Sequence, residues 1–198
     1  GAGVFLAILG FAAQQAFAPI ISGVFIVMFK PFRVGDIISV GKEYFGHVED
    51  ITLRHTVITD WENRRIIIPN SIMGNETIIN SSIEDERICE FVVMGVSYDT
   101  NIDQAIKVIR EEAEKHPFCI DTRTVQEINE GIPKVKVQVI GFGDSSVTLR
   151  ANVWRDDLVN ARMMHFDLNK SIKERFDLEG IEIPFPYRTI VYKDPEKQ

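Results

Sequence analysis

The first 29 residues of the chain contain no charged side chain, and Lys30 is the first ion. As one straight helix, at about 1.5 Å per residue, this run would be longer than the roughly 30 Å hydrocarbon core of a bilayer. A secretory signal peptide would need a basic segment before a shorter apolar core, and the run has none. The sequence therefore predicts a transmembrane helix over residues 1–30. Because the chain opens inside this run without a methionine, we expect it to continue a longer polypeptide with further spans upstream.

The composition of this span indicates more than a lipid anchor. It carries Gln14, Gln15 and Pro19, which are tolerated at membrane depth where a helix packs against protein or lines water. Small side chains let membrane helices approach closely. Nine lie in the first 18 residues: Gly1, Ala2, Gly3, Ala7, Gly10, Ala12, Ala13, Ala16 and Ala18. Two interpretations stay open, an ordinary bundle helix and a pore-lining helix that associates with its own copies around an axis.

The charges that follow the span predict its orientation. Lys30 and Arg33 come directly after the apolar run and would anchor its end at the membrane interface. The positive-inside rule places that end in the cytoplasm, so everything from about residue 34 onward is expected to be cytoplasmic. Pro31 ends the helix, and Gly35 with Asp36 makes a turn into the first strand.

Residues 31–83 have the pattern of a small all-β domain. Short stretches rich in Ile, Val, Thr and aromatic residues alternate with turn residues. The predicted strands cover residues 36–40, 45–51, 53–59 and 65–68. They favour a β-barrel or sandwich. Residues 30–65 hold six basic and six acidic side chains and the whole chain has a net charge of -7, so no nucleic-acid partner is expected.

Residues 84–184 predict an α+β domain of ferredoxin-like character, with strands and helices in the order β-α-β-β-(β)-α. A strand at 88–97 leads to an amphipathic helix at 101–116, and a second helix covers 158–178. Further strands are expected at 125–128, 134–140 and 147–154. A last strand-like stretch, 187–192, is too short to fold alone, and we expect it to pair with another strand, of which its own copies are one candidate.

No catalytic, metal or cofactor site is expected. The run from Gly143 to Ser146 lacks the GxSxG spacing of a nucleophile turn, and the four histidines show no metal-ligand spacing. No phosphate-binding or dinucleotide-binding glycine pattern occurs. Cys89 and Cys119 stand thirty residues apart and are interpreted as core thiols.

Four motifs in a fixed order resemble the small-conductance mechanosensitive channel (MscS) family. They are MFKPFRVGD at 28–36, IIPNS at 67–71, GVSYDTNID at 95–103 and EGIEIPFP at 179–186. The resemblance implies a homo-heptamer in the inner (plasma) membrane, multi-pass in the full-length protein. It also implies four parts along the chain. Residues 1–30 would form a kinked pore-lining helix, 31–83 an Sm-like β-domain, 84–184 an α/β vestibule domain, and 185–198 a C-terminal β-barrel strand and tail.

The function that this resemblance implies is an ion channel. Membrane tension would open it, and ions and small solutes would leave the cell on hypo-osmotic swelling, with membrane lipids and further copies of the chain as its partners. No enzymatic activity is implied. A membrane-anchored cytoplasmic scaffold or binding module is the alternative, in which the helix is only an anchor.

The family's pore residues map onto this span with departures. The two apolar rings that seal the pore fall on Ala7 and Phe11, so Phe11 would carry most of the seal by excluding water from a narrow apolar neck. Phe11 packing against a neighbouring helix is the alternative. The family's kink glycine falls on Gln15, and we infer that Pro19, which removes a backbone hydrogen bond, causes the kink instead.

The acidic residues are concentrated in one segment. Residues 84–130 hold twelve acidic and five basic side chains, an excess equal to the whole net charge of -7. If this segment lines the vestibule, it would give a mild preference for cations. Glu111, Glu112 and Glu114 are the residues chosen to test that expectation. A solvated outer face is the alternative.

Overall fold

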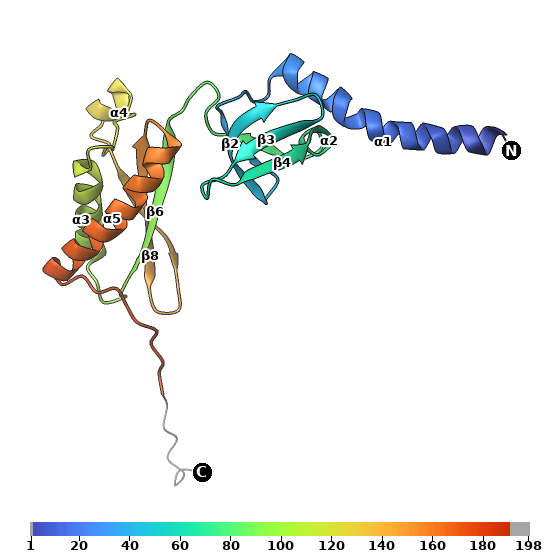
Figure 1. Cartoon of the computed structure of the whole chain (residues 1–198). Helices are drawn as coiled ribbons and strands as arrows, with labels where there is room; N and C mark the ends of the chain where they lie inside the picture. The colour runs from blue at the N-terminus through green and yellow to red at the C-terminus, as the bar shows by residue number, and fades with distance from the viewer. Residues whose placement is uncertain (1, 191–198) are drawn as a thin grey trace, which may run out of the picture. The chain divides into compact units, whose positions relative to one another are not determined.

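The computed structural model describes residues 2–190, without the side chains of residues 2, 5, 6, 11, 12, 15 and 16. The chain divides into two compact units, Gly1–Glu86 and Arg87–Gln198 (Figure 1). Each unit has a hydrophobic core of its own.

The first unit consists of a long helix and an antiparallel five-stranded sheet. Helix α1 covers Ala2–Phe29. The sheet has the order β4-β3-β2-β1-β5. Its elements are β1 (Ile37–Val40), β2 (Tyr44–Ile51), β3 (His55–Thr59), β4 (Arg65–Pro69), the short helix α2 (Asn70–Met73) and β5 (Ile78–Asn80). The four strands predicted here are confirmed, whereas the three-residue strand β5 was not predicted because it is too short to show an alternating pattern.

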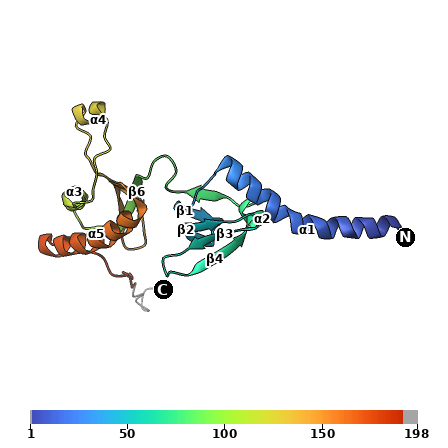
Figure 2. The ribbon, with the colours of Figure 1, turned by 45° about the horizontal axis from the view of Figure 1, so that its top comes forward.

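The core of the first unit joins the sheet to the end of α1. Its buried side chains are Ile26, Phe32, Ile38, Val40, Val48, Ile58, Ile68 and Met73. Helix α1 contributes Ile26 and, three residues earlier, the buried Gly23. The N-terminal part of α1 extends away from the sheet, and the helix changes direction before it reaches α2 (Figure 2). In the part of the chain that the structure describes, no helix is long and apolar enough to cross a membrane. The transmembrane helix predicted over residues 1–30 is therefore not confirmed.

The second unit is a three-stranded antiparallel sheet with two helices packed on one face. The strands β6 (Ile88–Val96), β8 (Val147–Arg155) and β7 (Lys136–Phe142) lie in that order. Helices α3 (Ile102–Lys115) and α5 (Leu158–Glu179) provide the other half of the core. In β8 the odd-numbered residues are buried under these helices and the even-numbered ones are half-buried on the open face. The helices predicted at 101–116 and 158–178 are confirmed.

One expectation for the second unit is wrong. Residues 125–128 form a helix, α4 (Val125–Asn129), and not a strand. Thr124 and Glu127 make a capping box, in which each side chain accepts a hydrogen bond from the other residue's backbone N–H, and this local arrangement outweighs the strand propensity of Val125 and Ile128. Residues 181–190 form no regular element in the single chain, and the strand expected at 187–192 stays a prediction. Residues 191–198 lie outside the described part of the chain.

Candidate functional site

The sequence-predicted pore residues lie along α1. Ala7 is exposed, and Pro19 is half-buried within the helix. The side chains of Phe11 and Gln15 lie outside the described residues, although both positions are helical. Of these four positions, the structure places Pro19 beside the sheet, where it lines a cavity with residues of the β2–β3 turn and β4.

The two basic residues predicted as interface anchors lie where α1 ends. Lys30 has a φ of 50°, a left-handed conformation, and its N–H donates to the carbonyl of Ile26 at 2.9 Å. The N–H of Arg33 donates to Asp36 Oδ2 at 2.9 Å, and Asn80 Nδ2 donates to the same carboxylate oxygen at 2.8 Å. Both basic side chains are exposed, while the backbone between them is fixed to the sheet by Asp36.

Helix α1 lies very close, at Gly23, to the five-stranded sheet and α2, which together are called the sheet unit below. A Cβ atom placed on Gly23 would lie 2.6 Å from Asn70 Nδ2 and 2.8 Å from the carbonyl carbon of Leu53, with the carbonyl oxygen of Leu53 closer still. Only a residue without a side chain fits at these distances. Glycine is therefore required at this point of the helix, although the helix itself is continuous here.

Asn70 is the polar centre of this contact. Its side chain is completely buried, and its Nδ2 donates to the carbonyl of Thr52 at 2.8 Å. Its Oδ1 accepts from the hydroxyl of the equally buried Thr56 at 2.9 Å. Its backbone N–H donates to the carbonyl of Arg54 at 2.9 Å. Because an unpaired polar group would be costly at this depth, these bonds fix the β2–β3 turn, β3 and the start of α2 in one arrangement.

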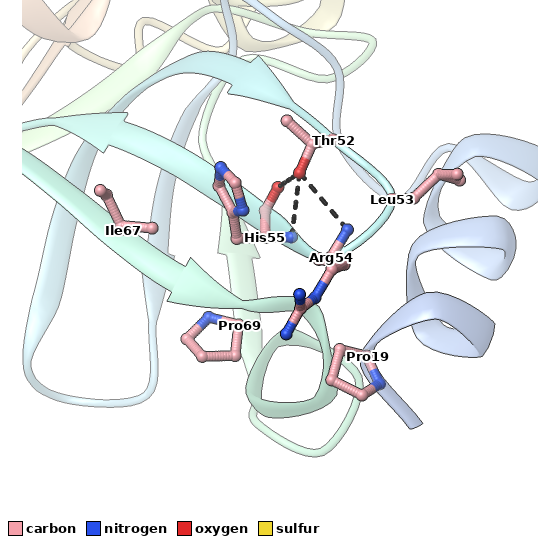
Figure 3. Close-up of a pocket in the computed structure, with 7 residues that line it drawn as sticks. All are labelled: Pro19, Thr52, Leu53, Arg54, His55, Ile67 and Pro69. Carbon is pink, nitrogen blue, oxygen red and sulfur yellow. Dashed lines mark hydrogen bonds between the residues drawn. The ribbon is translucent and has the colours of Figure 1, made fainter. Parts of the chain in front are cut away.

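A cavity of about 650 Å³ lies beside this contact (Figure 3). Pro19, Leu53, Ile67 and Pro69 form its apolar walls, and no carboxylate is among the described residues that line it. The side chain of Arg54 extends toward Pro69 and Pro19 across the cavity (Figure 3). The turn beneath is rigid because Thr52 Oγ1 donates to the carbonyl of His55 at 2.8 Å and accepts from two backbone N–H groups. There is thus free volume next to the proline of α1.

The glutamates chosen to test ion preference hold the second unit together. Glu112 is buried, and its carboxylate lies 2.9 Å from Arg175 Nη1 on α5. Glu111 lies 3.3 Å from the same guanidinium. Hydrogen bonds to Glu179, Glu111 and Glu112 raise the pKa of Arg175 further above its usual range. Glu114 accepts from the backbone N–H of Val135 at 3.2 Å. Neutralising these three residues would therefore disturb the packing of α3 before it tested any effect on ions.

Gly23 and Asn70 were not identified as site residues from the sequence. Asn70 lies in the IIPNS motif that carried part of the resemblance, so the position was noted while its role was not. Gly23 is one of several glycines in an apolar run, and nothing in the sequence distinguishes it from Gly10. Its role becomes visible only when residues 23, 53 and 70 meet in space.

Comparison with known families covers most of the chain. Residues 15–83 match the family model described as "Mechanosensitive ion channel, beta-domain", and residues 91–183 match the one described as "Mechanosensitive ion channel MscS, C-terminal". These matches include α1 from residue 15 onward, the Gly23–Asn70 contact and the elements of the second unit from residue 91 to residue 183.

Individual relatives give the same result. An uncharacterized MscS family protein of Archaeoglobus fulgidus is 32% identical over 185 residues, which cover 92% of this chain and 60% of the relative. The small-conductance mechanosensitive channel MscMJ of Methanocaldococcus jannaschii is 31% identical over 201 residues, which cover 96% of this chain and 52% of the relative. The crystal structure of Helicobacter pylori MscS in the closed state superposes with a TM-score of 0.77 at 26% identity, covering 96% of this chain and 72% of that one. The chain spans 60% or less of the length of these two curated relatives.

Proposed function

Because the chain belongs to the MscS family of mechanosensitive ion channels, we propose that it forms the pore and the cytoplasmic part of a channel that membrane tension opens. The channel would release ions and small solutes when a cell swells. The single observation that carries this proposal is the contact of α1 with the sheet unit at Gly23 and Asn70, inside the matched region, because it links a long apolar helix mechanically to a folded domain.

The N-terminal half of α1 is proposed to line the pore in a ring of copies. Apart from the exposed Gln14, its described side chains are apolar and mostly exposed in the single chain, including Val4, Ile8 and Leu9. Burying them requires lipid or other helices. We place the seal at Phe11, with Ala7 one turn earlier, in the same register. Water would leave this narrow apolar neck, and ions cannot cross without their hydration.

The bend in α1 is proposed to lie at Gln15 and Pro19. The support is that Pro19 sits inside the helix, that the ribbon changes direction before α2, and that a cavity adjoins Pro19. Proline removes one backbone hydrogen bond and crowds the preceding turn. The cavity of about 650 Å³ means that the sheet does not cover this side of α1 at Pro19.

The location that follows from this proposal is the inner membrane, with residues after about 34 in the cytoplasm. Lys30 and Arg33 would lie at the membrane interface, where their long side chains reach the lipid headgroups. Their exposure at the end of α1 supports this placement. Membrane lipids would then be direct partners of the channel.

The assembly is proposed to be a homo-heptamer. Seven copies of this 22.5 kDa chain amount to roughly 158 kDa. Light scattering of detergent-solubilised protein should give a mass well above that of a dimer, and a monomer or dimer would contradict a pore built from α1. Removing residues 187–198 should weaken assembly without abolishing it, because contacts between the helices and between the sheet units remain.

The decisive experiment is electrical recording from membrane patches that hold the full-length protein. Suction should evoke currents that grow with applied tension, and patches without the protein should show none. Full-length protein that reaches the membrane as an oligomer yet gives no tension-dependent current would refute the channel proposal. That outcome would favour a membrane-anchored cytoplasmic scaffold instead.

A further inference from the structure

The segment that follows helix α5, residues 181–187, is attached to the second unit where it begins. The helix ends at Gly180, which has a left-handed φ of 68°, and the chain then turns back toward the end of the three-stranded sheet (Figure 1). Ile181 is buried in the core of this unit. The backbone N–H of Ser97, directly after β6, donates to the carbonyl of Glu182 at 3.0 Å. The start of the segment is therefore fixed by packing and by a hydrogen bond.

The other end of the segment is held at Tyr187. Its backbone N–H donates to Ser145 Oγ at 3.0 Å, in the turn between β7 and β8. Its hydroxyl donates to Glu182 Oε1 at 2.6 Å, so the phenol reaches back to the start of the segment. This hydrogen bond raises the pKa of the Tyr187 phenol above its ordinary value, because it stabilises the protonated form. Residues 182–187 thus form a loop that is bonded to the sheet and to itself.

The turn that carries Ser145 is itself ordered. The N–H of Gly143 donates to the carbonyl of Ser146 at 2.7 Å, and the hydroxyl of Tyr98 donates to the carbonyl of Gly143 at 2.7 Å. This is the run from Gly143 to Ser146 that lacks the spacing of a nucleophile turn. The structure gives Ser145 a different task, since its hydroxyl accepts a hydrogen bond from the backbone near the end of the chain.

Two prolines restrict the residues between the anchors. Pro184 and Pro186 have a fixed φ near -65° and no N–H to donate, and each favours an extended conformation in the residue before it. A segment of this kind has fewer conformations to lose than a flexible one, so little free energy is needed to hold it. The two hydrogen bonds of Tyr187 are therefore sufficient, although its side chain is 60% exposed.

We propose that residues 182–187 are a latch, which fixes where and in which direction the C-terminal tail, residues 188–198, leaves the second unit. When the latch is closed, the tail starts beside the turn between β7 and β8. When it opens, the chain is released from residue 183 onward, because Glu182 stays bonded to Ser97. In a ring of copies, every tail would start at an equivalent point. That consequence rests on the proposed assembly, whereas the latch itself does not.

Hydrogen exchange read by mass spectrometry tests the latch in the full chain. The two prolines have no N–H, so a fragment that covers residues 183–188 reports on few amides, among them the amide that Ser145 holds. Tyr187→Phe removes the bond to Glu182, and Ser145→Ala removes the acceptor of the backbone N–H. Each substitution should speed exchange of residue 187 about fivefold, the equivalent of one net hydrogen bond, and the double variant should speed it further.

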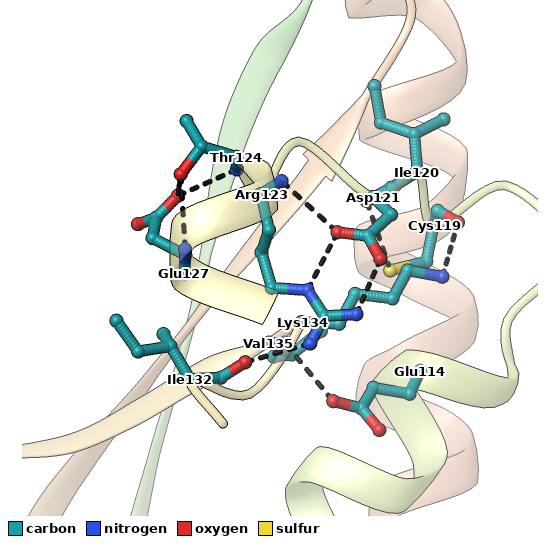
Figure 4. A network of polar contacts seen from close by, with 10 residues as sticks. All are labelled: Glu114, Cys119, Ile120, Asp121, Arg123, Thr124, Glu127, Ile132, Lys134 and Val135. Carbon is teal, nitrogen blue, oxygen red and sulfur yellow. Dashed lines mark hydrogen bonds and ion pairs between the residues drawn. The ribbon is translucent and has the colours of Figure 1, made fainter. Parts of the chain in front are cut away.

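A second amide of the same unit provides the internal reference. The N–H of Val135 donates to a side-chain oxygen of Glu114 at 3.2 Å, in the polar network between α3 and β7 (Figure 4). Its exchange should be the same in the parent and in the variants, because none of the altered bonds belongs to that network. Tyr44→Phe, in the first unit, is the matched control for the loss of one phenol hydroxyl, and it should exchange like the parent at residue 187.

The outcomes separate the latch from the assembly. Parent-like exchange at residue 187 in both folded single variants, as judged by circular dichroism, would overturn the latch. Equally faster exchange at Val135 would also overturn it, since the variants would then loosen the whole unit. By light scattering, the double variant of an oligomeric protein should dissociate at a higher protein concentration than the parent. A monomeric parent would contradict the proposed assembly, while the exchange rates still decide the latch.

Discussion

The contact of Gly23 with the sheet unit makes Gly23→Ala the most informative substitution in α1. An alanine Cβ would lie 2.6 Å from Asn70 Nδ2 and 2.8 Å from the carbonyl carbon of Leu53, whereas ordinary van der Waals contacts begin at 3.4 Å. The turn at Leu53 cannot move aside easily, because Thr52 and Asn70 bond its neighbouring backbone groups. The helix must therefore shift away from the sheet by a large part of an ångström.

The expected cost follows from three opposing terms. Overpacking a tight contact costs about 1–3 kcal/mol, and weakening the bond from Asn70 to the Thr52 carbonyl adds about 1 kcal/mol. Alanine regains about 1 kcal/mol through its higher helix propensity. We expect the free energy of unfolding to fall by about 2 kcal/mol. For a unit of this size that corresponds to a drop of roughly 10 °C in the midpoint of thermal unfolding.

The assay is thermal unfolding followed by circular dichroism, together with hydrogen exchange of the backbone amides in the last two turns of α1. Gly10→Ala is the matched control, since a Cβ at Gly10 meets no atom within 4 Å. It should leave the midpoint unchanged or raise it slightly. If Gly23→Ala unfolds at the same temperature as Gly10→Ala, and exchange in α1 is unchanged, the contact does not hold the helix against the sheet.

Three further predictions concern other parts of the chain. Asn70→Ala should lower the free energy of unfolding by about 2–3 kcal/mol in a denaturant titration, because it leaves buried partners unpaired, whereas Asn75→Ala on the surface should change it little. Phe11→Ser should hydrate the neck and lower the tension needed for opening in patch recordings; an unchanged threshold would make Phe11 a packing residue. Hydrogen bonds from Arg123 lower the pKa of Asp121 to about 2, so their contribution to stability is present above about pH 4 and is lost as the pH falls toward 2. Arg123→Ala should return this pKa toward about 4 in an NMR titration, and a value still near 2 would contradict the assignment.

The elements that were predicted correctly are those whose pattern is long or repeated. Helix α3 shows its apolar face every three or four residues and has Asn101 as its N-cap, so its ends were placed within one residue. Strand β8 alternates through nine residues. Helix α4 was missed because its five residues favour a strand by composition, while the Thr124 and Glu127 pair that caps it was not weighed. Short elements depend on such local bonds more than on hydrophobic period.

The candidate site could be predicted only in part, for a different reason. The family resemblance puts Phe11 and Pro19 on one helix, which the structure has, and their roles stay predictions. The Gly23 contact joins three segments that are far apart in the chain, and the two charged groups nearest in sequence, Lys30 and Arg33, take no part in it. Likewise, Glu111 and Glu112 could be counted as acidic, but their partner Arg175 lies more than sixty residues away. Pairings across such separations require the packed fold.

The contact at Gly23 divides α1 into a C-terminal part that is held against the sheet and an N-terminal part, residues 2–19, that extends away from it and is called the arm here. From residue 2 to Pro19 the arm is about 25 Å long at 1.5 Å per residue. A rotation of roughly 10° at Pro19 would carry the tip of the arm through about 4 Å, while the clamped turns beside the sheet stay in place. A small change of angle beside the cavity is thereby magnified at the opposite end of the helix. If α1 bends at Pro19 as proposed, the five-stranded sheet would stay fixed while the N-terminal part of the helix moves.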